Sequence, residues 1–302
     1  MSERVLTVGG ASASKPLTDF LLTNEYFGPK GGVYYVDGNV AATGGGSPDH
    51  PYATLVEAVT ASDAAMTLAA NRWWARRNRI YACGDTLTES LTKFPTKCDV
   101  IGCGSYDGNT RAGLYGRHVV AGEAYGTRFF NFHFRALAHA SPIITLTSSA
   151  GGVKTIGCLF DGILGTMTSA ILATASPFLE VEDCDFVGTF VTSYITFGAG
   201  QAGRAKIINN RMLGTAAKGI VAPAETTASW TPLIQGNTII ATGKPIEDAS
   251  NLFSVVNNRL ITAINIGTTT DGYSFNLALS SGNILTGLNG VAATVPFAVI
   301  AE

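Results

Sequence analysis

The amino-acid sequence predicts an all-β fold, a parallel β-helix with three short strands in each coil. Three observations support this prediction: a short sequence repeat, a strand-like composition within each repeat, and a regular stacking of side chains from one repeat to the next. The repeat is about 21–27 residues long, which is typical of solenoids, in which each unit buries its apolar face only against its neighbours. Three strands of about five residues each, with their turns, fill a coil of this size.

The repeat is clearest between Val153 and Gly214. Cys158, Cys184 and Asn210 are equally spaced along the chain, and each is followed, two positions later, by a Phe or a Met. The segments around them are short, β-branched or aromatic, and interrupted by Gly, Asn and Asp, which is typical of strands rather than helices. The register continues upstream to Phe132 and Phe134. Downstream it continues, at slightly varying steps, to Asn237, Asn258 and Asn283.

The repeat also places side chains in columns along the solenoid. If Val181 points inward, the same register turns Thr155, Ile207 and Ile234 inward as well. The outward neighbours then form the column Lys154, Glu180 and Lys206, which alternates in charge. Because neighbouring strands lie about 4.8 Å apart, opposite charges on adjacent rungs attract.

One bend of each coil is expected to carry a hydrogen-bonded asparagine ladder, in which each amide bonds to the next rung. Its members are Asn210, Asn237, Asn258 and Asn283. Cys158 and Cys184 occupy the same register and are expected to act as small apolar fillers of the interior. The five cysteines include no CxxC pair, so a structural role is favoured over a metal or redox role.

Composition restricts the class of protein. Only 14% of the 302 residues are charged, against about 25% in an average soluble domain, and 35 residues are glycine. Because solubility normally depends on a charged surface, we expect copies of the same chain or other partners to cover much of the outside. The formal net charge of −2 argues against nucleic acid or an anionic membrane as the main partner.

The chain contains no long apolar segment and no leader-like start. No stretch of eighteen or more apolar residues is present, so no transmembrane helix is expected. Residues 1–8 lack the basic start and the apolar run of a signal peptide. We therefore expect a protein that is made or assembled in a cytoplasm.

Taken in order, the chain divides into an arm, a solenoid and a tail. Residues 1–32 do not repeat and are expected to form an arm that docks on a partner or particle. The solenoid, residues 33–290, should begin with a strand and turn at 33–38. A short helix from Thr54 to about Ser62 is suited to capping the open end, and strands are expected at 79–82, 84–91 and 97–104. Residues 291–302 break the register and form an apolar tail, expected to cap the last rung or to pack on a neighbouring subunit.

The segments after the arm follow a characteristic order: Val36-Asp37, Ser47-Pro48, residues 51–55 and Ala58, then Gly84, Glu89 and residues 100–104. This order resembles the opening of right-handed parallel β-helix proteins of the pectin-lyase-like superfamily, with a strand, a capping helix and the first rungs. The resemblance extends from about Val33 to Gly290, and the chain is most similar to phage tailspike and virion decoration proteins. It implies the fold but no single function, because the superfamily also includes polysaccharide lyases, hydrolases and epimerases.

The resemblance also directs attention to outward carboxylates, because lyases of the superfamily bind Ca²⁺ through such groups and its hydrolases use clustered Asp. The candidates here are Glu180, Glu182, Asp183 and Asp185, with Asp161 one rung earlier. Paired carboxylates can act as acid and base or bind Ca²⁺. We favour a structural interpretation. Lys154 and Lys206 are expected to neutralise Glu180, and Asp183 is expected to occupy a bend. In addition, the turns are too short to form the walls of a deep cleft.

A basic run with two tryptophans is the other candidate binding feature, and it contains Trp73, Trp74, Arg76 and Arg77. Trp and Arg are enriched in protein interfaces, although the same mixture suits stacking on sugars or contacts with nucleic acid. We favour an interface or packing role. The four histidines show no metal-binding spacing and the Gly44–Gly46 loop lacks the Lys of a phosphate-binding loop, so no metal and no cofactor are expected.

These observations lead us to expect a non-enzymatic structural protein of a phage virion, either a capsid decoration protein or a tailspike-type β-helix. It would form a homo-oligomer, expected to be a trimer, attach to a capsid or tail protein through residues 1–32, and reach the virion after assembly in the host cytoplasm. One alternative is a polysaccharide lyase or hydrolase that uses Glu182, Asp183 and Asp185 on a surface glycan. Another is a non-hydrolytic adhesin that binds a host surface glycan through Trp73 and Trp74.

Overall fold

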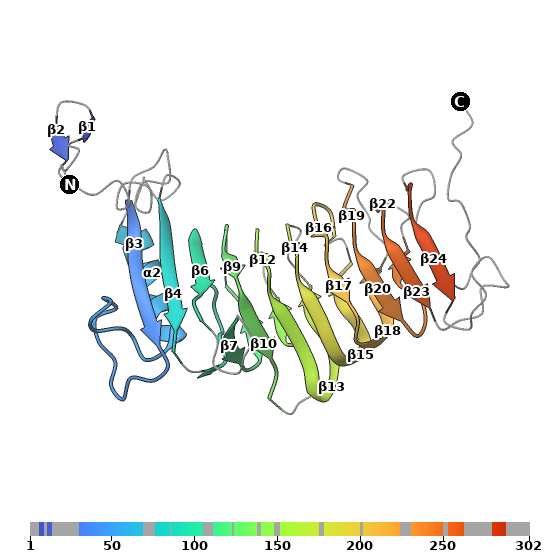
Figure 1. Ribbon diagram of the computed structural model, residues 1–302, viewed down its shortest axis with the longest axis horizontal. Helices are drawn as coiled ribbons and strands as arrows, with labels where there is room; N and C mark the ends of the chain where they lie inside the picture. The colour runs from blue at the N-terminus through green and yellow to red at the C-terminus, as the bar shows by residue number, and fades with distance from the viewer. Residues whose placement is uncertain are drawn as a thin grey trace, which may run out of the picture.

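The computed structural model confirms an all-β protein built as a parallel β-helix (Figure 1). Figure 1 shows the rungs standing side by side along the long axis, from β3 to β24. The structure describes residues 6–8, 11–13, 30–68, 76–84, 86–104, 111–122, 124–137, 140–147, 152–174, 178–199, 202–223, 231–249, 253–262 and 280–287.

Face 1 of the solenoid, in the described part of the chain, is a nine-stranded sheet in which every pair of neighbours is parallel. A typical strand has one buried residue between two partly exposed ones, as Val181 lies between Glu180 and Glu182. The strands in spatial order are β3 (Lys30–Asp37), β4 (Arg77–Cys83), β6 (Cys98–Gly102), β9 (Arg128–Phe130), β12 (Lys154–Ile156), β14 (Glu180–Glu182), β16 (Lys206–Ile208), β19 (Leu233–Gln235) and β22 (Ser254–Val256).

A second sheet provides the other two faces, because its longest strands bend and cross from one face to the next. Face 2 contains β5 (Leu87–Thr88), β7 (Ala112–Tyr115), β10 (Phe132–Arg135), β13 (Leu159–Ala173), β15 (Asp185–Phe197), β17 (Arg211–Met212), β20 (Thr238–Ala241), β23 (Arg259–Thr262) and β24 (Ile284–Gly287). Face 3 contains the second halves of β13 and β15 together with β8 (His118–Val120), β11 (Ile144–Leu146), β18 (Thr215–Ala222) and β21 (Ile246–Asp248).

A single left-handed residue turns the chain from face 1 to face 2 in successive rungs. Each of these residues is Gly, Asn or Asp, with φ between 52° and 67°: Asn131, Gly157, Asp183, Asn209, Gly236, Asn257 and Gly282. These three residue types adopt the left-handed region at the lowest cost. The sequence repeat is clearest beside this bend because the bend accepts so few residue types.

The columns expected around Val181 are confirmed. Thr155, Val181, Ile207 and Ile234 are register partners and all four are buried. On the outside, Glu180 lies 3.3 Å from the amine of Lys154 and 3.1 Å from that of Lys206. Deeper in the core, the rings of Phe134, Phe160 and Phe186 stack with centroids 5.3 and 4.8 Å apart, and Cys158 and Cys184 fill the interior as expected.

The expected repeat length is correct for the body of the solenoid but not for its entrance. In the body, the steps between register partners, such as Lys154 to Glu180 and Leu233 to Ser254, lie within the expected range. At the entrance, the step from Arg79 to Asp99 is shorter than that range and the step from Asp99 to Arg128 is longer. The register of the strands is kept while the turns between them change in length, so the repeat is harder to recognise there.

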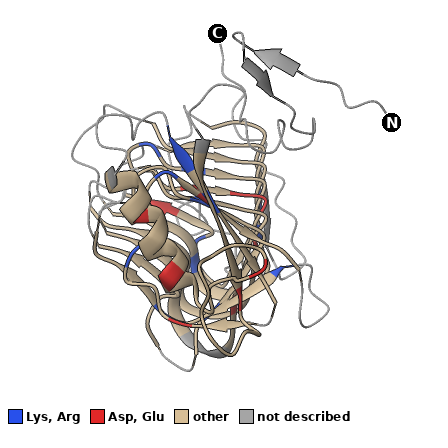
Figure 2. Ribbon diagram, turned by 90° about the vertical axis from the view of Figure 1, so that its left-hand side faces the viewer, with Lys and Arg blue, Asp and Glu red and all other residues tan. Residues whose placement is uncertain are grey.

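The helix α2 (Leu55–Leu68) lies at the N-terminal end of the solenoid, as Figure 2 shows from that end. It continues past Ser62, the residue at which we expected it to end. Leu55, Ala58, Val59, Ser62 and Met66 are buried at helical spacing, against β3 and β4. Met66 adds a further turn to the apolar face, which explains the greater length.

The N-terminus of α2 is held in two ways. Thr54 and Glu57 form a capping box, in which the Glu57 N–H donates to Thr54 Oγ1 at 3.3 Å and the Thr54 N–H donates to Glu57 Oε2 at 3.1 Å. The carboxylate of Glu89 accepts the N–H groups of Leu55 at 2.7 Å and Val56 at 2.9 Å. Because a negative charge is favourable at a helix N-terminus, Glu89 ties the cap to the first coil.

Little of the two ends belongs to the described part of the chain. In the arm, β1 (Leu6–Val8) and β2 (Ala11–Ala13) form a separate antiparallel pair. The tail, residues 291–302, lies outside the described residues, so the boundaries after residues 32 and 290 stay predictions. Among the residues that the structure describes, no helix combines the length and apolarity needed to cross a bilayer.

Candidate functional site

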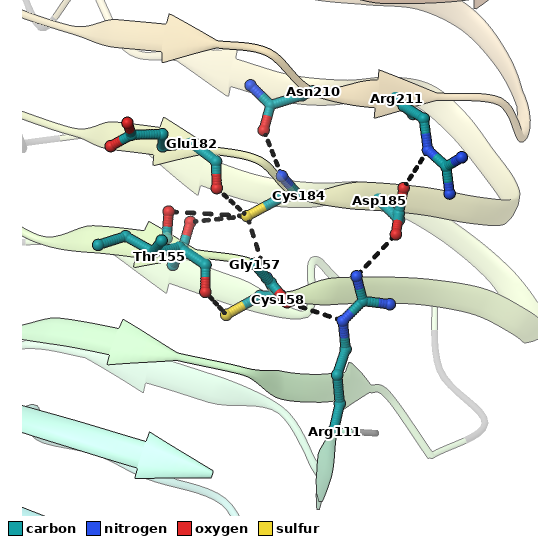
Figure 3. A network of polar contacts seen from close by, with 10 residues as sticks. Arg111, Thr155, Gly157, Cys158, Glu182, Cys184, Asp185, Asn210 and Arg211 are labelled. Carbon is teal, nitrogen blue, oxygen red and sulfur yellow. Dashed lines mark hydrogen bonds and ion pairs between the residues drawn. The ribbon is translucent and has the colours of Figure 1, made fainter. Parts of the chain in front are cut away.

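Asp185 projects outward at the start of β15 and lies between two arginines (Figure 3). Arg111 donates from Nη2 to Asp185 Oδ2 at 2.7 Å, and Arg211 donates from Nε to Oδ1 at 2.7 Å. Partial burial acts to raise the pKa of Asp185, but the hydrogen bonds and charges of Arg211 and Arg111 lower it. Both carboxylate oxygens are therefore engaged, and the group is a weak base.

Glu182 and Asp183 do not join Asp185 in one site. Glu182 Oε2 lies 2.5 Å from the Lys154 amine on the outer surface of face 1. Asp183 is the exposed bend residue, with φ 52°. Figure 3 shows Glu182 and Asp185 on opposite sides of the bend at Cys184. The three carboxylates that the enzymatic alternative requires are thus separated by the bend between the faces.

Asp161, one rung earlier, belongs to a buried polar cluster that the sequence analysis did not identify. His133 Nε2 lies 3.2 Å from Asp161 Oδ2, and the Tyr115 hydroxyl lies 3.3 Å from His133 Nδ1. The guanidinium of Arg135 lies 5.4 Å from the centroid of the Tyr115 ring. Burial acts to raise the pKa of Asp161, but the hydrogen bonds from His133 and from the Ile163 N–H, with the Arg135 charge, lower it. His133 is a buried histidine whose two ring nitrogens both lie within hydrogen-bond distance of a polar partner.

The two arginines of the basic run have different roles, and its two tryptophans lie outside the described residues. Trp73 and Trp74 are outside, so their interface or carbohydrate role stays a prediction. Arg76 donates from Nη1 to the carbonyl of Ala65 in α2 at 3.3 Å, which attaches the strand entrance to the cap. Arg77 points along the outside of face 1, where it lines a groove with residues from four further rungs.

This groove is a surface cavity of about 510 Å³ along the edge of face 1 where its strands begin. It crosses five consecutive rungs, from β4 to β14. Among the described side chains that line it, four are cationic and one is acidic, and two aromatic side chains, Tyr125 and Phe178, are 39% and 37% exposed. The lining residues are Arg77, Lys97, Tyr125, Gly126, Arg128, Gly152, Lys154, Phe178 and Glu180.

Two of the residues that line the groove are the glycines Gly126 and Gly152. Gly126 and Gly152 are both left-handed, with φ 67° and 82°. A Cβ atom on Gly126 would lie 3.5 Å from Arg77 Nη2, and one on Gly152 would lie 3.4 Å from the Gly126 nitrogen. Two successive rungs therefore carry no side chain at this turn, and a larger residue at either position would extend into the groove.

Arg77, Arg128 and Lys154 are held in position by carboxylates beside them. Asp99 accepts hydrogen bonds from Arg77 at 2.8 Å and from Arg128 at 2.6 and 2.7 Å. Partial burial acts to lower the pKa of Lys154, but Glu182 and Glu180 raise it, so its amine stays charged. The guanidinium of Arg204 lies 5.0 Å from the centroid of the Phe178 ring at the far end. Fixed cations beside exposed aromatic rings can bind an anionic partner that also has an apolar side.

The asparagine ladder is present and hydrogen-bonded from member to member. Each Nδ2 donates to the Oδ1 of the next asparagine at 2.9 Å, from Asn210 to Asn237, from Asn237 to Asn258 and from Asn258 to Asn283. Each of these Oδ1 atoms also accepts the backbone N–H of the preceding member at 2.8 or 2.9 Å. The Cys184 N–H donates to Asn210 Oδ1 at 2.9 Å, so the cysteine column continues the ladder. This arrangement is structural, since all its members are buried.

No group of three or more potential metal ligands is found among the residues that the structure describes. Comparison of the chain with protein-family models, with curated proteins and with solved structures gives no match. A functional conclusion therefore depends on the geometry of the solenoid surface and on the resemblance of its entrance.

Proposed function

We propose that this protein is a non-enzymatic structural component of a phage virion, a capsid-decoration or tailspike-type β-helix of the pectin-lyase-like superfamily. In this proposal it forms a homotrimer in the host cytoplasm and attaches to a capsid or tail protein through residues 1–32. The observation that carries the proposal is the neutralisation of the outer carboxylates. Asp185 is bound by two arginines, Glu180 lies between two lysines, and Glu182 pairs with Lys154.

The outer surface of face 1 carries apolar side chains, which favours a surface covered by another protein over one that is fully exposed to solvent. A second outward column runs beside the charged one and consists mainly of apolar side chains, which are partly exposed. Its first five members are Tyr35, Tyr81, Ile101, Phe130 and Ile156. Tyr35 and Tyr81 stack with ring centroids 5.5 Å apart. Five consecutive apolar or aromatic side chains on the outside, before the column reaches Glu182, favour a protein–protein interface.

The entrance of the solenoid also supports the proposal. Strand β3, helix α2 and strands β4 and β6 follow the order of strand, capping helix and first rungs on which the resemblance depends. This resemblance to pectin-lyase-like proteins concerns the fold, so the virion role is tested by a separate experiment.

The decisive experiment compares the full chain with a variant that begins at Gly31. Light scattering should give a trimer for both, and only the full chain should co-purify with phage particles or with isolated capsid or tail protein. A monomer in both cases, or attachment that does not need the arm, would contradict the proposal.

The two alternatives give different results with single variants. An enzyme would cleave a surface glycan, and Asp185→Ala would abolish cleavage while the protein stays folded. An adhesin would bind glycan without cleaving it, and Trp74→Ala would remove binding. We expect neither cleavage nor glycan binding from the intact protein in a glycan-array and reducing-end assay.

A further inference from the structure

The groove at the edge of face 1 has no part in the proposed function as stated above. We infer that it binds an extended acidic peptide segment of a partner protein, with an apolar side chain of that segment seated between Tyr125 and Phe178. The inference rests on the proposed structural function and adds a second attachment site to the arm. The charge, shape and length of the groove each support it.

Charge indicates an anionic partner. Arg77, Lys97, Arg128 and Lys154 line the groove, whereas Glu180 is the one acidic residue of its described lining. The whole chain has a formal net charge of −2, so this concentration of cations is local. Arginine and lysine held by neighbouring carboxylates keep their geometry and lose little side-chain entropy on binding a further carboxylate.

Glu180 favours a peptide over a uniformly anionic polymer. It lies in the groove between Lys154 and Lys206, where a chain with a negative charge on every unit would place a carboxylate beside it. A peptide can place a neutral or apolar residue at that point and its acidic residues elsewhere. The combination of Arg, Tyr and Phe around a small depression is also the composition typical of protein interfaces.

Shape and length fit a short extended segment. Five rungs at about 4.8 Å spacing give a groove about 19 Å long, which holds about six residues of extended chain. Gly126 and Gly152 line the groove without a side chain, and Gly152 belongs to the rung between those of Tyr125 and Phe178, where we place the apolar side chain of the peptide. The acidic residues on either side of that side chain would lie against the cations of neighbouring rungs.

The test uses a fluorescein-labelled peptide of about eight residues in which acidic residues flank a single Phe. Fluorescence anisotropy with the full-length protein should show saturable binding that weakens as salt is added. Replacing the Phe of the peptide with Ser, or its acidic residues with Lys, should weaken binding by about tenfold or more. Polygalacturonate, an acidic glycan chain, serves as the competitor that represents the other class of anionic polymer.

Matched variants locate the binding. Lys97→Glu reverses a charge in the groove, and Phe178→Ala removes an exposed aromatic ring from its lining. Gly152→Asn introduces a side chain at a lining glycine, and Asn tolerates the left-handed conformation of that position. Each should weaken peptide binding by about tenfold, while melting curves show that the fold is kept. Arg117→Glu makes the same charge change at an exposed position outside the groove, and it should leave binding unchanged.

Three results would overturn the inference: no saturable peptide binding, equal weakening by Arg117→Glu, or preferential binding of polygalacturonate through the same groove residues. None of these affects the trimer or the role of the arm. The two hypotheses can fail separately. If the variant that begins at Gly31 attaches to particles as well as the full chain does, the proposed function fails. If the groove variants still lose peptide binding in that case, the peptide site remains.

Discussion

At the scale of single residues, the bend between faces 1 and 2 depends on the buried asparagine ladder, in which the side-chain donors and acceptors are hydrogen-bonded from one member to the next. Asn237 is 0% exposed, its Nδ2 donates to Ile207 O and Asn258 Oδ1, and its Oδ1 accepts two N–H groups from Asn210. Such a network is stabilising when complete and costly when one member is removed, because its partners stay buried and lose their bonds.

The first prediction concerns this column. Asn237→Ala should lower the free energy of unfolding by about 3 kcal/mol, because donors on Asn210 and the carbonyl of Ile207 lose their partner. Guanidinium denaturation followed by circular dichroism measures the change. Asn209→Gly, at the adjoining left-handed bend, is the control and should change the value by less than about 1 kcal/mol. Equal stability of the two variants would show that the ladder is not a main source of stability.

The second prediction concerns pH. The folded pKa of Asp185 lies below its ordinary value of 3.8, so its ion pairs contribute stability that is fully present above that value. This contribution is lost as the pH falls through the lower folded pKa, because the unfolded chain then binds the proton more readily. Asp185→Asn should therefore reduce the pH dependence of unfolding below about pH 4. Urea denaturation at a series of acidic pH values tests this, and parallel curves for the two proteins would contradict it.

At the scale of elements, the cap shows how a helix is attached to a solenoid. Helix α2 has its own capping box, but the carboxylate of Glu89 also reaches its first two N–H groups from the adjoining coil. The apolar face from Leu55 to Met66 provides the remaining contact. A helix fixed at its N-terminus and along one face remains in place over the open end.

The third prediction separates these contributions. Thr54→Ala removes the acceptor of the capping box and should cost about 1 kcal/mol. Glu89→Gln keeps the size of the side chain but removes the charge, and it should increase hydrogen exchange of the amides of Leu55 and Val56. Exchange measured by mass spectrometry on peptides of α2 distinguishes the two effects. Unchanged exchange in Glu89→Gln would show that the local capping box suffices.

At the scale of the whole molecule, each rung pairs its strands with the rungs beside it, and a few long side chains such as Arg111 reach further. Stability is therefore distributed along the axis, and the ends are the weak points. The N-terminal end is covered by α2, which contacts β3 and β4. An uncovered end would present a row of unpaired backbone groups to other chains.

The fourth prediction follows from this architecture. Leu55→Asp places a charge where Leu55 is fully buried and should detach the cap. Hydrogen exchange should then increase in β3 and β4 while β15 stays protected, and light scattering should show larger, end-to-end aggregates. A uniform increase in exchange over all rungs would mean that the solenoid unfolds as one cooperative unit.

The sequence by itself determined the repeat, the inward and outward columns and the asparagine ladder. In a parallel in-register stack, a residue and its equivalent one repeat later are always neighbours, so the constant interval from Cys158 to Cys184 and on to Asn210 already states which side chains meet. It also determined that Glu180 is neutralised by its neighbours, because Lys154 and Lys206 are one step away in each direction. Contacts along the axis can therefore be derived from spacing alone.

Tertiary structure alone decided the features that depend on how turns and faces lie beside each other. His133 meets Asp161 outside the strict register, in which its partner is Leu159, because side chains two positions apart share an outward face. The groove is lined by Tyr125, Gly126, Gly152 and Phe178, which come from the turns of three successive rungs. The turns before the strands of face 1 differ in length from rung to rung, as the steps from Arg79 to Asp99 and from Asp99 to Arg128 show. Only the folded chain therefore shows which side chains these turns bring together.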